Sequence, residues 1–176
     1  DVTVLLITFF LTVIFDLTVA IEVGLVIACV LFMKRVMETT KISVITDEID
    51  PNKESDIAVH EENLMIPKGI EVYEINGPYF FGIATKFEET MTQLGDRPKV
   101  RIIRMRKVPF IDSTGIHNLT TLCEMSQKEK TTVILSGVNE NVHNVLEKAG
   151  FYELLGKENI CPNINVALER AKSLVK

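Results

Sequence analysis

The first 33 residues are almost wholly apolar, and this segment restricts the fold of the chain more than any other feature. Residues 2–15 carry no charged side chain, and residues 17–33 carry one, Glu22. A helix that crosses a bilayer needs about 20 apolar residues. One helix through the whole stretch would place Asp16 near the middle of the membrane, where a charge is costly. We therefore predict a membrane hairpin of two short helices that meet at Asp16. At 1.5 Å per residue each helix is about 20–26 Å long, too short to cross completely.

Basic residues directly after the apolar segment predict its orientation. Lys34, Arg35 and Lys41 place the following segment in the cytoplasm by the positive-inside rule. A signal peptide does not fit, because it would begin with basic residues and end in small ones. A soluble buried hairpin is an alternative, but the rest of the chain offers no partner of comparable apolarity. Because the chain begins within apolar sequence and without Met, we expect further membrane sequence upstream.

Residues 38–65 have the composition of a linker. The stretch is rich in Asp, Glu, Asn and Ser and contains Pro51, which is typical of a flexible or extended connection. Residues 41–46 form a candidate short strand at its start. His60 has no second metal ligand at a suitable spacing, so we interpret it as a solvated side chain.

Charge and cysteine content exclude several classes of protein. The net charge of −5 argues against a nucleic-acid partner, because phosphate binding requires a basic surface. Cys29, Cys123 and Cys161 are far apart and odd in number, so they form no disulfide framework. We expect the polar part of the chain to be reduced and cytosolic.

Strand and helix patterns alternate from residue 66 to residue 176. Strands are predicted at 69–75, 99–105 and 131–138, with a further short strand at 79–83. Apolar residues recur at helical spacing over 84–94, 113–128, 142–149 and 164–175. This order predicts an α/β domain with a mostly parallel sheet and right-handed crossovers.

The tetrapeptide Asp112-Ser113-Thr114-Gly115 lies where a strand is followed by a helix, the place at which ligands gather in α/β folds. Two interpretations are open. Asp and Ser are preferred N-cap residues, so the motif has a structural explanation. Alternatively, Ser113 is a phosphorylation site, because the amino end of a helix tolerates a phosphate.

Nucleophilic catalysis by Ser113 is disfavoured. The chain has no GxSxG elbow, and His117 follows on the same helix without an orienting acid. No metal constellation and no GxxxxGK loop is present either. We therefore predict that the chain is not an enzyme and that it needs neither a cofactor nor a metal.

A second candidate site is a group of basic residues near the strand at 99–105. One interpretation is that these side chains are only solvated residues at the ends of the strand. The other is that they form a patch that contacts anionic lipid headgroups or an acidic partner. Its members are Lys99, Arg101, Arg104, Arg106 and Lys107.

Several of these segments resemble a known family. VPFIDSTGIHNL (108–119) and TTVILSGVNENVHNVLEKAGF (131–151) resemble the STAS domain, which is shared by sulfate transporters and bacterial anti-sigma-factor antagonists. GPYFFGIATKF (77–87) is similar to the version carried by transporters. LTVIFDLTVAIEVGLVIACVLFMKR (11–35) looks like the last two short membrane helices of the SulP anion transporters.

The resemblance implies a domain division and a fold. Residues 1–37 would be the last membrane helices of a transport domain, 38–65 a linker and 66–176 a STAS domain. That domain would have a central mixed, mostly parallel sheet of about four to five strands flanked by helices. SulP proteins are multi-pass proteins of the inner or plasma membrane, with a cytoplasmic STAS domain and dimeric assembly.

The resemblance also implies a function, secondary active transport of sulfate, bicarbonate or a dicarboxylate by exchange or symport. The anion site would lie in the upstream transport domain, so no substrate-binding residue is assigned here. In the antagonists the serine of the motif is phosphorylated, and it maps onto Ser113. Some STAS domains dock acyl carrier protein, an acidic partner. The alternative function is a membrane-tethered phospho-switch that transports nothing.

Overall fold

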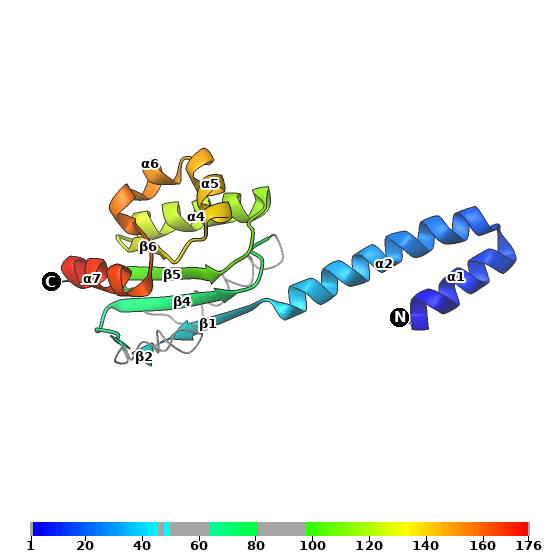
Figure 1. Cartoon of the computed structure of the whole chain (residues 1–176), viewed down its shortest axis with the longest axis horizontal. Helices are drawn as coiled ribbons and strands as arrows, with labels where there is room; N and C mark the ends of the chain where they lie inside the picture. The colour runs from blue at the N-terminus through cyan, green and yellow to red at the C-terminus, as the bar shows by residue number, and fades with distance from the viewer. Residues whose placement is uncertain (1, 46–47, 50–63, 81–97, 176) are drawn as a thin grey trace. The chain divides into compact units, whose positions relative to one another are not determined.

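The structure is a computed structural model that describes residues 2–45, 48–49, 64–80 and 98–175 (Figure 1). The chain divides into two compact units, Asp1–Thr39 and Thr40–Lys176. The first unit is helical, and the second contains the sheet.

The first unit consists of α1 (Val2–Ile14) and α2 (Leu17–Thr39). The Oδ1 atom of Asp16 accepts a hydrogen bond from the Val19 N–H at 2.9 Å, so Asp16 caps the start of α2. The predicted helix break at Asp16 is confirmed.

The predicted length of the second helix is wrong. α2 has 23 residues and is therefore about 34 Å long. Among the described residues, its segment Leu17–Val36 is the one helical stretch long and apolar enough to cross a membrane. The helix continues past Lys34 because no Pro or Gly interrupts it there, and Lys34 Nζ lies 4.0 Å from Glu38 Oε1, a favourable i,i+4 pair.

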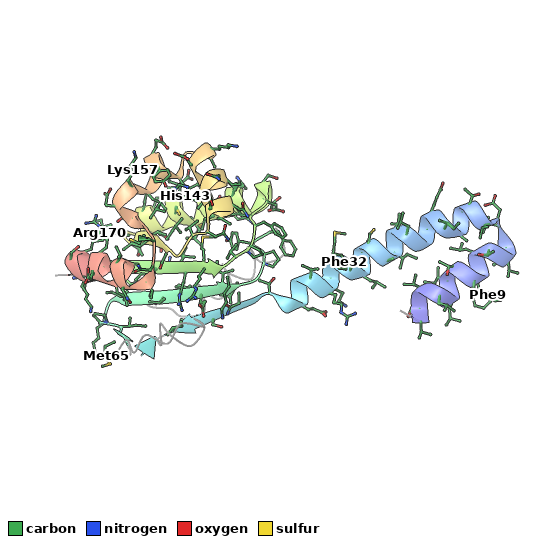
Figure 2. All side chains as sticks on the ribbon, viewed as in Figure 1. Phe9, Phe32, Met65, His143, Lys157 and Arg170 are labelled. Atoms are coloured by element: carbon green, nitrogen blue, oxygen red, sulfur yellow. The ribbon has the colours of Figure 1, made fainter. Side chains whose placement is uncertain are left out.

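The helices of the first unit meet through small residues. A Cβ atom at Gly24 would lie 2.4 Å from Thr8 Cγ2, and Ala20 is buried. Large apolar side chains instead project outward, as Phe9 and Phe32 do in Figure 2. Outward apolar side chains require lipid or further protein around them.

The second unit contains a five-stranded sheet in the order β1-β4-β5-β6-β7. β1 is antiparallel to β4, and the other neighbours are parallel. The predicted mixed, mostly parallel sheet is confirmed. The strands are β1 (Lys41–Ile45), β4 (Ile70–Asn76), β5 (Val100–Lys107), β6 (Thr132–Ser136) and β7 (Ile160–Cys161).

Two further strands, β2 (Glu48–Ile49) and β3 (Leu64–Met65), form a separate antiparallel pair. The strands β1, β2 and β3 all lie within residues 38–65, the stretch that the composition assigned to a linker. β1 is part of the main sheet because it pairs with β4, and it begins two residues after the end of α2.

Helices cover both faces of the sheet (Figure 1). One core joins Tyr73, Ile103 and Leu135 to the helices on their side, and the other joins Val72, Ile102 and Ile134 to α7. Neighbouring strand residues alternate between these cores, as a pleated strand requires. The helices are α4 (Ser113–Lys128), α5 (Glu140–Lys148) and α6 (Phe151–Leu155) on the first face, and α7 (Ile164–Val175) on the second.

The predicted helices 113–128 and 164–175 coincide with α4 and α7. The predicted helix 84–94 lies outside the described residues. So does most of the predicted strand 79–83, although Tyr79 makes an isolated parallel bridge to Ile111. The sequence patterns missed α6, the 3₁₀ turn η1 (Lys157–Asn159) and β7.

Candidate functional site

Asp112 is the N-cap of α4. Its φ and ψ of −93° and 176° are extended, and its Oδ1 atom accepts the Gly115 N–H at 2.6 Å. The Asp112 carbonyl accepts the Ile116 N–H at 2.9 Å. The capping interpretation of the motif therefore applies to Asp112, which satisfies one of the free N–H groups of the first turn.

Gly115 is required by close packing. Its position lies in the first turn of α4, where a Cβ atom would be 2.5 Å from the Tyr79 carbonyl oxygen and 3.0 Å from Ile111 Cγ1. Tyr79 also accepts the Asp112 N–H at 3.3 Å. The start of α4 therefore rests directly on the backbone of Tyr79.

Ser113 and Thr114 are exposed, in contrast to buried Gly115. Ser113 is the first residue of α4, next to the half-buried Asp112. Its hydroxyl is accessible to a modifying enzyme, and the helix dipole favours a negative charge at this end. The Asp112 carboxylate opposes such a charge at short range. The motif thus combines a structural cap with an accessible hydroxyl.

His60 lies outside the described residues, and the two described histidines, His117 and His143, take no part in the motif. His117 is exposed, one turn after Ser113. His143 of α5 contacts the hydroxyl of Tyr152 in α6 through Nε2, and the two rings meet edge to face. This pair joins two helices of the first face and has no role at Ser113.

Two of the five residues of the predicted basic patch are buried. Arg101 and Arg104 are 6% and 7% exposed, and each lies beside a carboxylate of β4. Arg104 Nη1 is 3.0 Å from Glu74 Oε1, and Arg101 Nε is 3.9 Å from Glu71 Oε2. Buried charges need such partners, so these two arginines belong to the interior rather than to a partner surface.

The other three basic residues lie at opposite ends of β5. Lys99 precedes the strand, and its Nζ donates to the carbonyl of Val175 at 3.3 Å. Arg106 and Lys107 stand at the end of the strand, beyond a register shift in the pairing of β4 with β5. The structure therefore does not bring the five predicted residues together.

Glu71, Tyr73, Arg101 and Ser126 form a buried polar network that the sequence reading missed. The Tyr73 hydroxyl donates to Glu71 Oε2 at 2.7 Å, and Arg101 Nη1 donates to Ser126 Oγ at 2.9 Å. The Arg101 guanidinium also lies 5.7 Å from the centre of the Tyr73 ring. Burial raises the pKa of Tyr73, and the hydrogen bond to Glu71 acts in the same direction. The network ties α4 to β4 and β5.

A cavity of about 260 Å³ lies at the other end of α4 from Ser113. It is lined by Gln127 in the last turn of α4, by Lys130 just beyond that helix and by Thr132 at the start of β6. Gln127 Nε2 donates to the Leu154 carbonyl at 2.9 Å, so part of its polar lining is already engaged. This cavity and the Ser113 motif are separate features.

The sheet-containing unit matches a known protein family. The model of the STAS domain matches residues 63–167. A crystal structure of a sulfate transporter family protein from Wolinella succinogenes is 41% identical, covers 72% of this chain and 98% of that protein, and has a TM-score of 0.61.

Full-length relatives are much longer than this chain. YvdB of Bacillus subtilis, which carries a sulfate transporter name, is 28% identical over 160 residues, which are 90% of this chain and 28% of YvdB. The chain therefore spans less than a third of that relative. The murine anion transporter Slc26a9 in its inward-facing state matches 97% of this chain and 28% of its own, at 17% identity and a TM-score of 0.72, which shows a shared fold.

The anti-sigma factor antagonist SpoIIAA in its unphosphorylated form also shares the fold. It is 16% identical, covers 64% of this chain and 96% of its own, and has a TM-score of 0.52. The stronger sequence identity is to the transporter relatives. The chain belongs to the STAS domain family and is homologous to the SulP sulfate transporters.

Proposed function

We propose that this chain is the C-terminal part of a SulP-type secondary active anion transporter. α1 and α2 complete its membrane domain, and the STAS domain regulates or assembles it. The substrate is sulfate, bicarbonate or a dicarboxylate, bound in a transport domain upstream of this chain. The protein acts without enzymatic chemistry of its own.

The observation that carries this proposal is an apolar helix pair joined to a STAS domain. The match to YvdB covers 90% of the chain, so it extends beyond the sheet-containing unit into the helices. Large apolar side chains on both helices are more than half exposed in this chain, which suits contact with lipid and with other membrane helices. They include Leu5, Phe9, Phe10, Val13, Leu25, Val26 and Phe32.

The proposal places the protein in the inner or plasma membrane as a multi-pass protein, with the STAS domain in the cytoplasm. Lys34 and Arg35 near the end of α2 support this orientation. Its partners would be the upstream transport domain, membrane lipid and a second copy of the protein. Docking of an acidic protein such as acyl carrier protein stays a prediction, and Arg101 and Arg104 are too deeply buried to contribute to it.

Uptake by the full-length transporter in proteoliposomes tests the function. Radiolabelled sulfate, bicarbonate and succinate would be offered with and without an opposing anion gradient. We expect saturable uptake of one of them, and a changed rate when residues 40–176 are removed. Absence of uptake of all three by correctly inserted protein would contradict the proposal.

A membrane-tethered phospho-switch is the second candidate function. The fold shared with an anti-sigma factor antagonist and the exposed hydroxyl of Ser113 favour it. The apolar helix pair counts against it, because a tether needs one spanning helix only. Phosphate on Ser113 in cells, together with absence of uptake, would favour this alternative.

A further inference from the structure

The cavity of about 260 Å³ at the carboxyl end of α4 has a wall that the fold holds in place. Asn159 is buried in this wall, where its Nδ2 atom donates to the Leu155 carbonyl at 2.6 Å. The Oδ1 atom of Asn159 accepts from Arg170 Nε at 3.1 Å. On the other side, Thr131 Oγ1 donates to the Pro98 carbonyl at 2.7 Å. The cavity is therefore pre-formed, and a ligand that enters it does not have to order the wall.

Lys130, which also lines this cavity, has an unusual backbone conformation. Its φ is 62°, and it is the one non-glycine residue with a positive φ in the part of the chain that the structure describes. The Lys130 N–H donates to the Gln127 carbonyl at 3.0 Å, and the Thr131 N–H donates to the Ser126 carbonyl at 2.8 Å. These two bonds form a Schellman motif at the end of α4. The left-handed position of this motif is usually glycine, because a side chain makes that conformation costly.

The fold itself gives no reason for lysine at this position. Glycine would close α4 without strain, and Lys128 already places a cation in the last turn of the helix. The Lys130 side chain is exposed, and its ammonium forms no ion pair with any residue that the structure describes. Strained residues that the fold does not require are typical of binding sites. The lysine side chain at the edge of the cavity is therefore the feature that the strain retains.

The other lining residues indicate the kind of ligand. Val133 and Leu155 are buried apolar residues of the wall. Gln127 Nε2 uses one hydrogen for the Leu154 carbonyl and has a second one to donate. None of the described residues that line the cavity is acidic. An ammonium and an amide N–H are suitable donors for a carboxylate, and the apolar wall suits a short hydrocarbon chain.

Size and local charge agree with such a ligand. The volume lies just below the range of roughly 300–1,000 Å³ in which drug-sized molecules bind, so a smaller molecule fits. The carboxyl end of a helix carries partial negative charge, which opposes an anion. Here the Schellman bonds engage the carbonyls of Ser126 and Gln127, and Lys128 and Lys130 outnumber Glu129.

We propose that this cavity binds a small organic carboxylate, with its carboxylate on Lys130 and Gln127 and its hydrocarbon chain on Val133 and Leu155. Inorganic sulfate fits less well, because it would leave the apolar wall uncovered and brings two charges to one lysine. The site lies at the other end of α4 from Ser113 and does not involve that motif. It goes beyond the proposed transporter function, and its binding is measured without transport, so failure of one leaves the other standing.

Methyl NMR of the full chain in lipid nanodiscs, titrated with sodium butanoate at constant ionic strength, tests the site. We expect saturable shifts of the Val133 and Leu155 methyl signals. The methyl signals of Val166 and Leu174, which are exposed on α7 outside the cavity, should stay unchanged. Sodium sulfate should not shift the signals of Val133 and Leu155. Absence of saturable shifts with butanoate would refute the proposal, and so would equal binding of sulfate.

Variants at position 130 test the role of the charge. Lys130→Gln should weaken butanoate binding by about tenfold, the contribution of a charge-assisted hydrogen bond, whereas Lys130→Arg should retain most of the affinity. Lys128→Gln is the matched control, because Lys128 is an exposed cation at the same helix end that does not line the cavity. It should leave the affinity unchanged. Equal weakening by Lys128→Gln and Lys130→Gln would overturn the proposal, since binding would then follow net charge alone.

Lys130→Gly separates binding from stability. Glycine adopts a positive φ without strain, so this variant should unfold at a higher urea concentration than wild type. It should nevertheless bind butanoate about tenfold more weakly, as Lys130→Gln does. A loss of affinity in a more stable protein cannot be attributed to misfolding. A lower urea midpoint for Lys130→Gly would contradict the proposal, because Lys130 would then serve the fold rather than a ligand.

Discussion

Arg104 and Glu74 are register partners on neighbouring parallel strands, and their side chains form a buried ion pair with Nη1 and Oε1 3.0 Å apart. Three residues earlier, Arg101 and Glu71 are also register partners and also pair. Because residues three apart on a strand point to opposite faces, one pair lies on each side of the sheet. Both faces therefore carry one charged contact between β4 and β5.

Loss of the Glu74 charge should destabilise the STAS domain strongly. Glu74→Gln leaves the Arg104 guanidinium buried without a counter-ion, and we expect a loss of about 3 kcal/mol in the free energy of unfolding. Urea unfolding of the segment Thr40–Lys176, followed by circular dichroism, measures it. Glu158→Gln is the matched control, because Glu158 pairs with Arg170 at 3.7 Å on the surface and should cost less than about 1 kcal/mol. Equal losses in both variants would contradict the prediction.

The Asp112 cap should contribute to stability, whereas the Ser113 hydroxyl should not. Asp112→Ala removes the acceptor of the Gly115 N–H, and we expect a loss of about 1 kcal/mol, which lowers the Tm by about 3 °C. Asp112→Asn should retain most of the stability. Thermal unfolding of the two variants and of Ser113→Ala separates these contributions. A Tm for Asp112→Ala that equals the wild-type value would show that the cap is replaceable.

Gly115→Ala should destabilise the domain, although alanine normally favours a helix over glycine by up to about 1 kcal/mol. The new Cβ atom would meet the Tyr79 carbonyl oxygen at 2.5 Å, and backbone cannot move aside as a side-chain end can. We expect a net loss of about 2 kcal/mol, measured by urea unfolding. A gain in stability would mean that the contact with Tyr79 relaxes without cost.

Alkaline pH should lower the free energy of unfolding, because the buried thiol of Cys123 and the buried hydroxyl of Tyr73 lose their protons less readily in the folded protein. Burial raises the pKa of the Cys123 thiol to about 12, from an ordinary value of 9.0. Above pH 9 the unfolded thiol loses its proton before the folded thiol does, so the free energy of unfolding falls as pH rises from 9 towards 12. The slope is at most about 1.4 kcal/mol per pH unit for each such group. Tyr73 acts in the same direction at higher pH, since burial raises its pKa as well.

Cys123→Ala provides the measurement for this group. The variant should be less stable at neutral pH because it leaves a small cavity, but its stability should depend less steeply on pH between 9 and 11. Urea unfolding at several pH values compares the two slopes. Parallel curves for wild type and variant would indicate that Cys123 does not carry the effect.

The sequence predicts best where a pattern is long and local. Asp16 interrupts an apolar run and marks the helix break, and the apolar stripe after Ser113 defines α4 to its last residue. The burial of Arg101 could not be predicted in this way, because its partners Glu71 and Ser126 are distant in sequence and meet it only in the folded sheet. β7 has two residues and α6 has five, too few for a period to appear.

The contacts of the Ser113 motif show the same limit. Asp112 could be predicted as a cap from its residue type and place. Its support by Tyr79 could not, because that contact depends on a single bridge between segments more than thirty residues apart. Glycine at position 115 was a local signal for this packing, since helix interiors otherwise disfavour it.

The two ion pairs between β4 and β5 also favour the observed register of these strands over a shifted one. A slip of one residue would turn every side chain to the wrong face, so the hydrophobic pattern already forbids it. A slip of two residues keeps each side chain on its own face and escapes that penalty. It would nevertheless separate Arg101 from Glu71 and Arg104 from Glu74 at the same time, so that both charges of each pair would lose their partner. The two ion pairs therefore disfavour a two-residue slip, which the alternation of apolar side chains alone does not penalise.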